Sequence, residues 1–438
     1  MLGLNRTTVA AAYELLESDG LVRARVGRGS FVVGPGDRPQ TPDWLREHGT
    51  AIAALPPEPE GVISFSAAKP SRDLFPVEDF RRTCEEVLSS PEAPAILQLG
   101  SPYGYAPLRE RLLSEGRKSG FVGPNDDVLI TNGCQQALDL LQRTLVRPGE
   151  TVLVEDPVYP GVKNLLLRAG ARLAAVPAGA AGISLAALDS APDARVLVTT
   201  PNFQSPTGGT LPADGRAELL RIARARGFAI IENDIYGDLR YSGQPLPALK
   251  QLDEDGRVVM LRSFSKIAFP GLRVGWMVGP APLIARIAEA KQLADLHTDQ
   301  LSQAVLLRFA ESGRLAAHRA RAVAAGAERL RAAIAACEEC LPPGTRFARP
   351  EGGMNLWVRL PEPLDSAVLL ARAHSEGVSY APGRFFEVER HEAGALRLSF
   401  AALSPDDIRR GLSILGRVVK QELEQALSAP RAEAPAMV

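Results

Sequence analysis

Residues 262–276 read RSFSKIAFPGLRVGW, and this stretch decides the fold. A short apolar run, VVML, comes immediately before it and predicts a buried parallel strand. Lys266 then lies on the loop that leaves the carboxyl end of the strand, where open α/β sheets bind their ligands. Ser263 and Ser265 flank the lysine, and Arg273 follows one loop later. This combination suits an aldehyde cofactor with a phosphate group, because the lysine can form a Schiff base while the hydroxyls and the guanidinium hold the phosphate.

A lone SxSK sequence is more typical of a solvated loop, but here it continues into GLRVGW. With that continuation, the stretch resembles the lysine loop of fold-type I pyridoxal-phosphate enzymes. The resemblance implies an α/β fold with a mostly parallel seven-stranded sheet, helices on both faces and a smaller C-terminal α+β domain. It also implies pyridoxal 5′-phosphate as the cofactor, Lys266 as the Schiff-base residue and an α-amino acid as the substrate.

Composition excludes several other classes of protein. The chain has 438 residues, of which 45% are apolar and 23% charged, and its net charge of −1 provides no basic field for nucleic acid. No apolar run reaches membrane-spanning length, so we expect no membrane partner. The four cysteines form no disulfide framework, which favours a reducing cytoplasm. Cys337 and Cys340 make a lone CxxC without the further ligands that zinc requires, so we expect no metal.

The first 33 residues resemble part of a DNA-binding module. Residues 5–16 have apolar positions at helical spacing, and residues 22–33 alternate around two glycines as a hairpin does. Together they resemble the recognition helix and wing of a GntR-type winged helix-turn-helix, as in MocR-like regulators. The resemblance implies phosphate or base contacts from Arg6, Arg23, Arg25 and Arg28. The helices that precede the turn in that family are missing from this sequence. We therefore predict an incomplete remnant that does not act as a DNA reader.

Composition and pattern predict five segments. Residues 1–33 form the winged-helix remnant, and the proline-rich residues 34–60 form a linker. Residues 61–300 form the cofactor-binding large domain, and residues 301–426 form the small domain. Residues 427–438 form a disordered tail.

Strands alternate with helices in the large domain, and the first strand–helix turn predicts part of the phosphate site. After the strand at residues 128–131, Gly133, Cys134 and Gln135 begin a helix whose free amides and dipole can bind an anion. A packed turn without a ligand is the alternative. Tyr159 follows the next strand, and its ring can stack on the cofactor's pyridine ring.

Two later strand ends predict contacts to the cofactor ring. Asp234 follows a buried strand and is predicted to keep the pyridine nitrogen protonated, which makes the ring an electron sink. Tyr236 is predicted to bond the ring's phenolic oxygen, whereas Glu232 is predicted to be structural. The family bonds the same oxygen through the asparagine of an Asn-Pro-Thr-Gly motif. Ser205 stands at that position here, and Asn202 is the candidate substitute.

The segment from residue 97 to 113 resembles the one that reaches the neighbouring subunit's active site in this family, which implies a homodimer. The tyrosine whose hydroxyl contacts the partner's cofactor phosphate is replaced by Leu99, with Tyr103 or Tyr105 as the candidate replacement. A second departure lies in the entry loop, where the family's Gly-Gly is replaced by Ala67 and Ala68, crowding a backbone that approaches the substrate.

Helical periodicity predicts helices over residues 283–310 and 314–337. Later, LRLSF predicts a strand that carries Arg397. A surface arginine on a strand is common, but in this place Arg397 resembles the arginine that grips the substrate α-carboxylate. A bidentate guanidinium suits that role better than a lysine does.

Three functions remain open from the sequence. The first is an amino-acid aminotransferase in which Lys266 moves the proton of the substrate Cα. The second is a pyridoxal-phosphate enzyme of β- or γ-elimination, replacement or carbon–carbon bond formation in specialised metabolism. The third is a MocR-like transcriptional regulator that senses the cofactor. The sequence favours the first of these.

Overall fold

The structure is a computed structural model that describes residues 13, 16, 21–25, 29–32 and 61–428. Residues 1–54 and 55–438 form two compact units.

In the first unit the described strands form a hairpin. β1 (Val22–Arg25) pairs antiparallel with β2 (Gly29–Val32), which confirms the hairpin predicted after the recognition helix. The helix predicted over residues 5–16 lies outside the described residues except for Tyr13 and Leu16, and the linker predicted over residues 34–60 lies wholly outside them.

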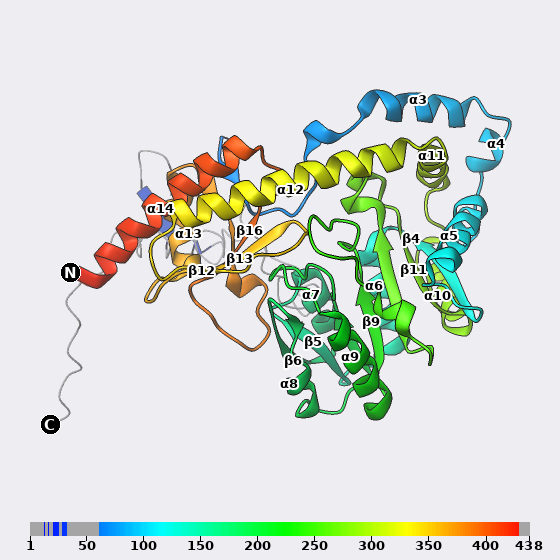
Figure 1. Cartoon of the computed structure of the whole chain (residues 1–438), viewed down its shortest axis with the longest axis horizontal. Helices are drawn as coiled ribbons and strands as arrows, with labels where there is room; N and C mark the ends of the chain where they lie inside the picture. Colours follow the sequence, from blue (N-terminus) through cyan, green and yellow to red (C-terminus); the bar gives the residue numbers. More distant parts are fainter. Residues whose placement is uncertain (1–12, 14–15, 17–20, 26–28, 33–60, 429–438) are drawn as a thin grey trace. The chain divides into compact units, whose positions relative to one another are not determined.

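An eight-stranded sheet forms the centre of the larger lobe of the second unit (Figure 1). Its order is β4-β11-β10-β9-β8-β5-β6-β7. The run from β10 to β6 is parallel, β11 is antiparallel to both neighbours, and β7 is antiparallel to β6. In chain order the strands are β4 (Asp126–Thr131), β5 (Thr151–Asp156), β6 (Arg172–Gly179), β7 (Gly182–Ile183), β8 (Val196–Thr199), β9 (Ala229–Asn233), β10 (Val258–Ser263) and β11 (Gly275–Pro280).

The predicted mostly parallel α/β sheet is therefore confirmed, but it has eight strands rather than seven. The additional strand is the two-residue β7, which folds back on the end of β6. Gly182, the first residue of β7, has a φ of +77°, a backbone conformation that glycine adopts without steric cost.

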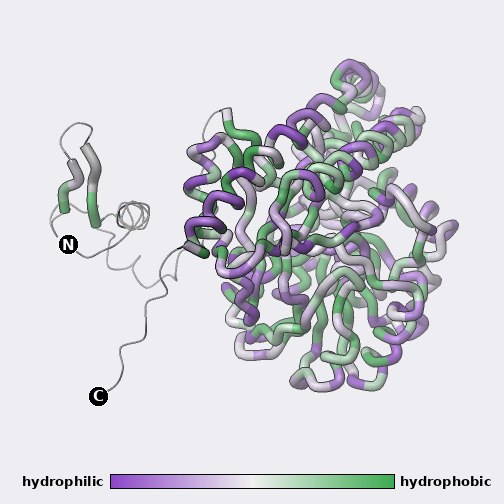
Figure 2. The backbone as a smooth tube through the Cα atoms, turned by 60° about the vertical axis from the view of Figure 1, so that its left-hand side comes forward, coloured by the Kyte–Doolittle hydropathy of each residue, from purple (hydrophilic) through white to green (hydrophobic). Residues whose placement is uncertain are grey.

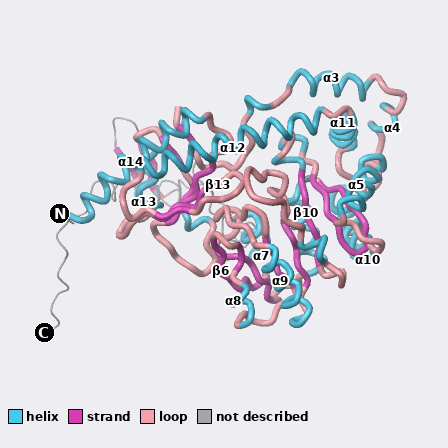
Figure 3. Tube along the Cα trace, viewed as in Figure 1, coloured by secondary structure: helices cyan, strands magenta, loops and turns pink. Residues whose placement is uncertain are grey.

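Helices cover both faces of the sheet, and the layers can be followed in Figure 3. One face packs on α6 (Gly133–Leu145), α7 (Pro160–Arg168) and α10 (Ala281–Asp295). The other packs on α5 (Ala106–Ser119), α8 (Leu185–Asp189), α9 (Ala213–Arg226) and α11 (Gln300–Glu311). The central strands are apolar on both faces, as buried parallel strands require, and their hydrophobic residues are coloured along the tube in Figure 2.

The prediction of one helix over residues 283–310 is wrong in one respect. The segment forms two helices, α10 and α11, separated by a break. Leu296 follows α10 with a φ of +61°, which ends the helix. Asp299 then caps α11, and its carboxylate accepts from the amides of Leu301 at 3.3 Å and Ser302 at 2.8 Å. Apolar periodicity continues through the break, so the pattern alone did not reveal it.

The smaller lobe contains an antiparallel sheet of order β12-β13-β16-β15. Its strands are β12 (Arg346–Phe347), β13 (Asn355–Arg359), β15 (Ala381–Pro382) and β16 (Ala395–Ser399). The lobe's core packs this sheet on α12 (Arg314–Cys340), α13 (Ser366–Ser375) and α14 (Pro405–Ser428). α12 packs on α11 and then along α14, so it joins the two lobes (Figure 1). None of the described helices is long and apolar enough to cross a membrane.

Two predicted boundaries need correction. β3 (Ile63–Ser64) pairs in parallel with β14 (Val378–Ser379), so the first strand after residue 60 belongs to the smaller lobe and not to the large domain. α14 ends at Ser428, so the first two residues of the predicted tail are helical, and residues 429–438 lie outside the described residues. The division at residue 300 stays a prediction. The remaining helices, α3 (Val77–Leu88) and α4 (Ala93–Ile96), precede α5.

Asp299→Ala should destabilise the fold at the start of α11. The variant leaves two helical amides without their acceptor, so we expect the free energy of unfolding to fall by about 1 kcal/mol. Urea denaturation monitored by circular dichroism measures this, with Glu289→Ala on the exposed side of α10 as the control. Equal stability of the two variants would contradict the capping role.

Candidate active site

Three neighbouring strands of the larger lobe deliver their polar residues to one edge of the sheet. β8, β9 and β10 are adjacent and parallel, so their carboxyl ends meet there. Asn202 follows β8, Asp234 follows β9, and Lys266 follows β10. The predicted cluster at the carboxyl ends of the strands is therefore present.

Lys266 occupies the short 3₁₀ turn after β10. Its Nζ donates to the carbonyl oxygen of Ala68 at 2.7 Å and lies 5.7 Å from the centroid of the Tyr236 ring. In the described part of the chain, no carboxylate forms an ion pair with Lys266. A primary amine held this way, without a carboxylate partner, is available to an aldehyde.

The beginning of α6 and the loop before β11 form an anion cradle. Arg273 has a φ of +56° and approaches Gly133 so closely that a Cβ there would collide with its Nη2. Ser263 Oγ donates to Ser265 Oγ at 2.9 Å beside this loop. The guanidinium of Arg273 has no carboxylate partner among the described residues, and donates only to the Pro270 carbonyl at 3.4 Å. Helix amides, two hydroxyls and an unpaired guanidinium fit a phosphate dianion.

Other residues predicted for this region take structural contacts. Cys134 Sγ donates to the Arg262 carbonyl at 3.2 Å, and burial raises the pKa of the Cys134 thiol to about 12, so the thiol is neutral near pH 7. Gln135 Nε2 donates to the Gly161 carbonyl at 3.2 Å, which fixes the loop beside Tyr159. Tyr159 is 43% exposed at the start of α7, where its ring is accessible to a ligand.

Asp234 is buried, and both of its carboxylate oxygens are engaged. Oδ1 accepts from Asn202 Nδ2 at 2.8 Å, and Oδ2 lies 3.2 Å from Arg262 Nε. Burial raises the pKa of Asp234, while the Arg262 cation and the Asn202 hydrogen bond act in the opposite direction. Glu232, two residues earlier on β9, accepts from the amides of Leu249 and Lys250. These contacts agree with the structural role predicted for it.

Asn202 is also hydrogen-bonded by a buried arginine of α9. Its Oδ1 accepts from Arg216 Nη2 at 2.6 Å, and Arg216 is fully buried. Both ends of the Asn202 carboxamide therefore have partners, and its contacts position Asp234. Its predicted role as the substitute for the family asparagine at Ser205 has no support in these contacts.

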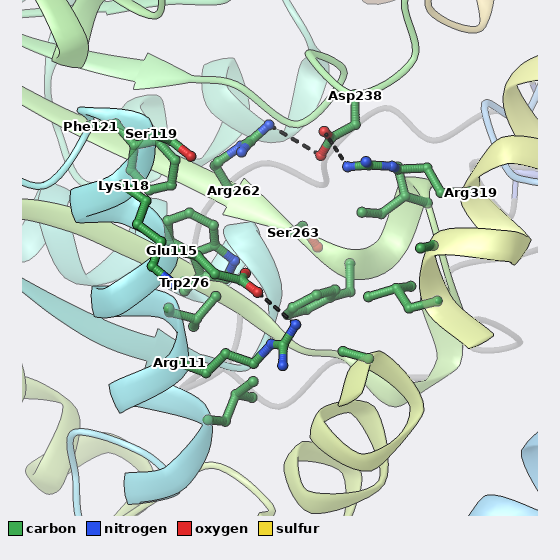
Figure 4. Close-up of a pocket in the computed structure, with 17 residues that line it drawn as sticks. Arg111, Glu115, Lys118, Ser119, Phe121, Asp238, Arg262, Ser263, Trp276 and Arg319 are labelled. Atoms are coloured by element: carbon green, nitrogen blue, oxygen red, sulfur yellow. Dashed lines mark hydrogen bonds and ion pairs between the residues drawn. The ribbon is translucent and has the colours of Figure 1, made fainter. Parts of the chain in front are cut away.

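Arg262 was missed as a site residue by the sequence reasoning. Alternation along β10 directs its side chain to the face of the sheet that also carries Trp276, and Nη2 pairs with Asp238 at 3.1 Å. Arg319 of α12 pairs with the other oxygen of Asp238 at 3.2 Å, and Figure 4 shows this chain of charges beside a cavity of about 480 Å³. An arginine at the end of a buried apolar strand requires a carboxylate partner, which was the available signal.

Arg397 lies on β16, buried at the junction of the lobes. Its Nη2 donates to the Ser66 carbonyl, Nη1 donates weakly to Ser205 Oγ at 3.4 Å, and the guanidinium lies 4.7 Å from the centroid of the Phe386 ring. Burial lowers the pKa of Arg397, but a guanidinium still remains protonated. No carboxylate of the described residues pairs with it, so it can accept one from a ligand.

Tyr103 is not brought to this cluster within one chain. Its ring lies 5.2 Å below the guanidinium of Arg109, which also pairs with Asp127. The role predicted for it at the neighbouring subunit's active site stays a prediction.

The sheet, the lysine after β10 and the anion cradle at α6 together define a fold-type I pyridoxal-phosphate-dependent transferase. The family model described as aminotransferase class I and II matches residues 62–415, and the chain belongs to this family. Its cofactor is pyridoxal 5′-phosphate, and the residues described above fit that group.

Three similar proteins illustrate the relationship. The aromatic-amino-acid aminotransferase 1 of Thermococcus litoralis is 34% identical, over 84% of this chain and 90% of its own. The crystal structure of Pyrococcus horikoshii kynurenine aminotransferase, in complex with PMP, is 36% identical with a TM-score of 0.80, and covers 83% of this chain and 92% of its own. The probable rhizopine catabolism regulatory protein MocR of Rhizobium meliloti is 30% identical, over 94% of this chain and 86% of its own.

Arg262→Met should change the pH dependence of activity. Removing the cation lets the pKa of Asp234 rise further, so the ionised carboxylate is lost at a higher pH as the solution is acidified. We expect the acidic limb of kcat/KM to move upward by about one pH unit or more. Arg319→Met, which removes only a contact to Asp238, is the control, and identical limbs in both variants would contradict the role of Arg262.

Proposed function

We propose that the protein transfers the amino group of an α-amino acid to a keto acid. One observation carries this proposal: two cations without carboxylate partners are held by the same short segment. Ala68 accepts from the amine of Lys266, and Ser66 accepts from the guanidinium of Arg397. An amino acid has an amino group for the lysine-bound cofactor and a carboxylate for the arginine, so both ends of the substrate find a partner.

When bound, pyridoxal phosphate supplies an electron sink for the electron pair left at the substrate Cα. Lys266 Nζ would take the proton from the substrate Cα and return a proton to complete the amino transfer. Asp234 holds a proton at the ring nitrogen, while Arg262 and Asn202 keep the Asp234 carboxylate in place. Arg397 binds the α-carboxylate and fixes the orientation of Cα.

The remaining predicted residues complete the cofactor contacts. Arg273, Ser263, Ser265 and the amides of Gly133 and Cys134 hold the phosphate. Tyr159 would stack on the cofactor ring, and Tyr236 and Ser205 would contact its phenolic oxygen. The relatives act, by name, on aromatic amino acids and kynurenine, which supports an amino-acid substrate for this chain.

The Schiff base at Lys266 is tested by chemical labelling. Protein reconstituted with pyridoxal phosphate should absorb visible light, and borohydride reduction should attach the cofactor to Lys266, as identified by peptide mass spectrometry. Lys266→Ala removes the reacting amine and should lose both signals, whereas Lys69→Ala, an exposed lysine next to Ala68, should retain them. A label on another lysine would contradict the proposal.

Transamination is then separated from elimination by the products. Incubation with amino acids and a keto-acid acceptor should form a new amino acid without release of ammonia. Ammonia release in the absence of an acceptor would favour elimination instead.

We also propose that the protein acts as a homodimer in the cytoplasm. All four cysteines are free, which suits a reducing compartment. Gln300 Nε2 donates to the Gln98 carbonyl at 2.8 Å and so ties the loop of Leu99 to the beginning of α11. Leu99 is 72% exposed, and Leu293 at the end of α10 is 91% exposed. Exposed leucines on adjoining segments mark a surface that a second copy can bury.

Leu293→Glu should weaken this dimer, because a charge would be buried in an apolar interface. Sedimentation velocity at micromolar concentration should show a shift from dimer toward monomer. Leu167→Glu, an exposed leucine on α7, is the control and should remain dimeric. A dimer of unchanged affinity in Leu293→Glu would place the interface elsewhere.

A further inference from the structure

The two central strands of the smaller lobe direct one face toward the substrate anchor. β13 and β16 pair so that Asn355 lies opposite Ser399 and Trp357 lies opposite Arg397. Leu356 and Val358, which alternate with them, belong to the core of the smaller lobe. Asn355 and Trp357 therefore share the opposite face with Arg397. Trp357 and Arg397 also share a contact with the ring of Phe386 on that face.

Asn355 is the least satisfied polar side chain on this face. It is 1% exposed, and neither its Nδ2 nor its Oδ1 has a hydrogen-bond partner. Among the described residues, nine buried side-chain atoms lack a partner, and four of them lie here: both atoms of the Asn355 carboxamide, Trp357 Nε1 and Arg397 Nε. Burying a carboxamide without hydrogen bonds is unfavourable, and an apolar side chain on this strand would avoid that cost.

The surroundings of Asn355 connect it to the active site. The turn that carries Ser205 packs against β13, since a Cβ on Gly208 would lie 3.1 Å from the Asn355 carbonyl oxygen. Ser205, in the same turn, accepts a weak hydrogen bond from Arg397 at 3.4 Å. Ser399, opposite Asn355, donates its amide hydrogen to the Phe65 carbonyl. Three residues later in that segment, the Ala68 carbonyl accepts from Lys266. Asn355 thus lies buried on the strand face that carries Arg397, beside the turn that carries Ser205.

We propose that Asn355 determines substrate specificity by hydrogen-bonding a neutral polar side chain of the amino acid that Arg397 anchors. A carboxamide offers one donor group and one acceptor, so the matching substrate class has side chains with a carboxamide or a hydroxyl. An apolar side chain of the same size leaves both atoms of Asn355 unpaired, and sites of this kind discriminate strongly against such substrates. The proposal rests on the proposed transamination and goes beyond it in naming the substrate class.

Substrates of matched shape test this directly: asparagine against leucine, glutamine against methionine, and tyrosine against phenylalanine. The wild-type protein, with pyridoxal phosphate bound, should have the higher kcat/KM for the polar member of at least one pair. Asn355→Leu keeps the number and the branching of the side-chain heavy atoms, is larger in volume, and has no hydrogen-bonding atoms. It should lower kcat/KM for that polar substrate by about 10- to 100-fold and remove the preference.

A second readout is independent of turnover. Without amino acid, Asn355→Leu should have a higher Tm than the wild type, because it removes an unpaired buried amide. The polar substrate should then raise the Tm of the wild type more than that of the variant. Leu356→Met changes the same strand on the opposite face and should keep the wild-type preference.

The outcomes separate the two proposals. If the wild type transaminates but Asn355→Leu keeps the same preference within each pair, the role of Asn355 is overturned and the aminotransferase function stands. If borohydride labels no lysine and no amino acid reacts, the aminotransferase function fails and the specificity proposal fails with it.

Discussion

A buried carboxylate imposes the strongest constraint on this structure. Asp234 is shielded from water, and burial alone would favour its neutral form. Arg262 and Asn202 offset that tendency, and Asn202 is itself fixed by Arg216. These partners come from the neighbouring strands β8 and β10 and from the helix that follows β8, while Asp234 follows β9. Hydrogen-bond lengths vary by only a few tenths of an ångström. The register of three parallel strands must therefore be kept to hold one carboxylate.

The sequence predicted the part of the site that depends on strand ends. Lys266, Asp234 and Gly133 each follow a short apolar run, and parallel strands bring such positions together whatever their order in the sheet. Residues that depend on which strands are neighbours were not predicted. Arg262 reaches Asp234 only because β10 lies beside β9, and Arg216 reaches Asn202 only because α9 packs below β8. The break before α11 was missed for a related reason, since its signal is a backbone angle and a cap, not a change in periodicity.

The departures from the family pattern have different consequences in three dimensions. Leu99 lacks the hydroxyl of the tyrosine that the family has at this position, but it contributes to an exposed apolar surface. Ala68 acts through its backbone carbonyl, which its methyl group does not block. Ser205 has only a weak contact with Arg397, and the nearby Asn202 is fully engaged with Asp234. The carboxamide without a partner is instead Asn355, from a strand of the other lobe that is distant in the sequence.

The two faces of β13 explain why such a residue is tolerated. One face supplies Leu356 and Val358 to the apolar core formed with α12 and α14, and each fully buried aliphatic side chain contributes about 1.5–3 kcal/mol. The opposite face carries the unpaired atoms of Asn355, Trp357 and Arg397, each of which costs stability in the free protein. A strand fixed by its core face can hold unpaired polar groups in one geometry, so that a substrate finds them already oriented. The same burial that makes these groups unfavourable without a ligand makes their hydrogen bonds to a ligand selective.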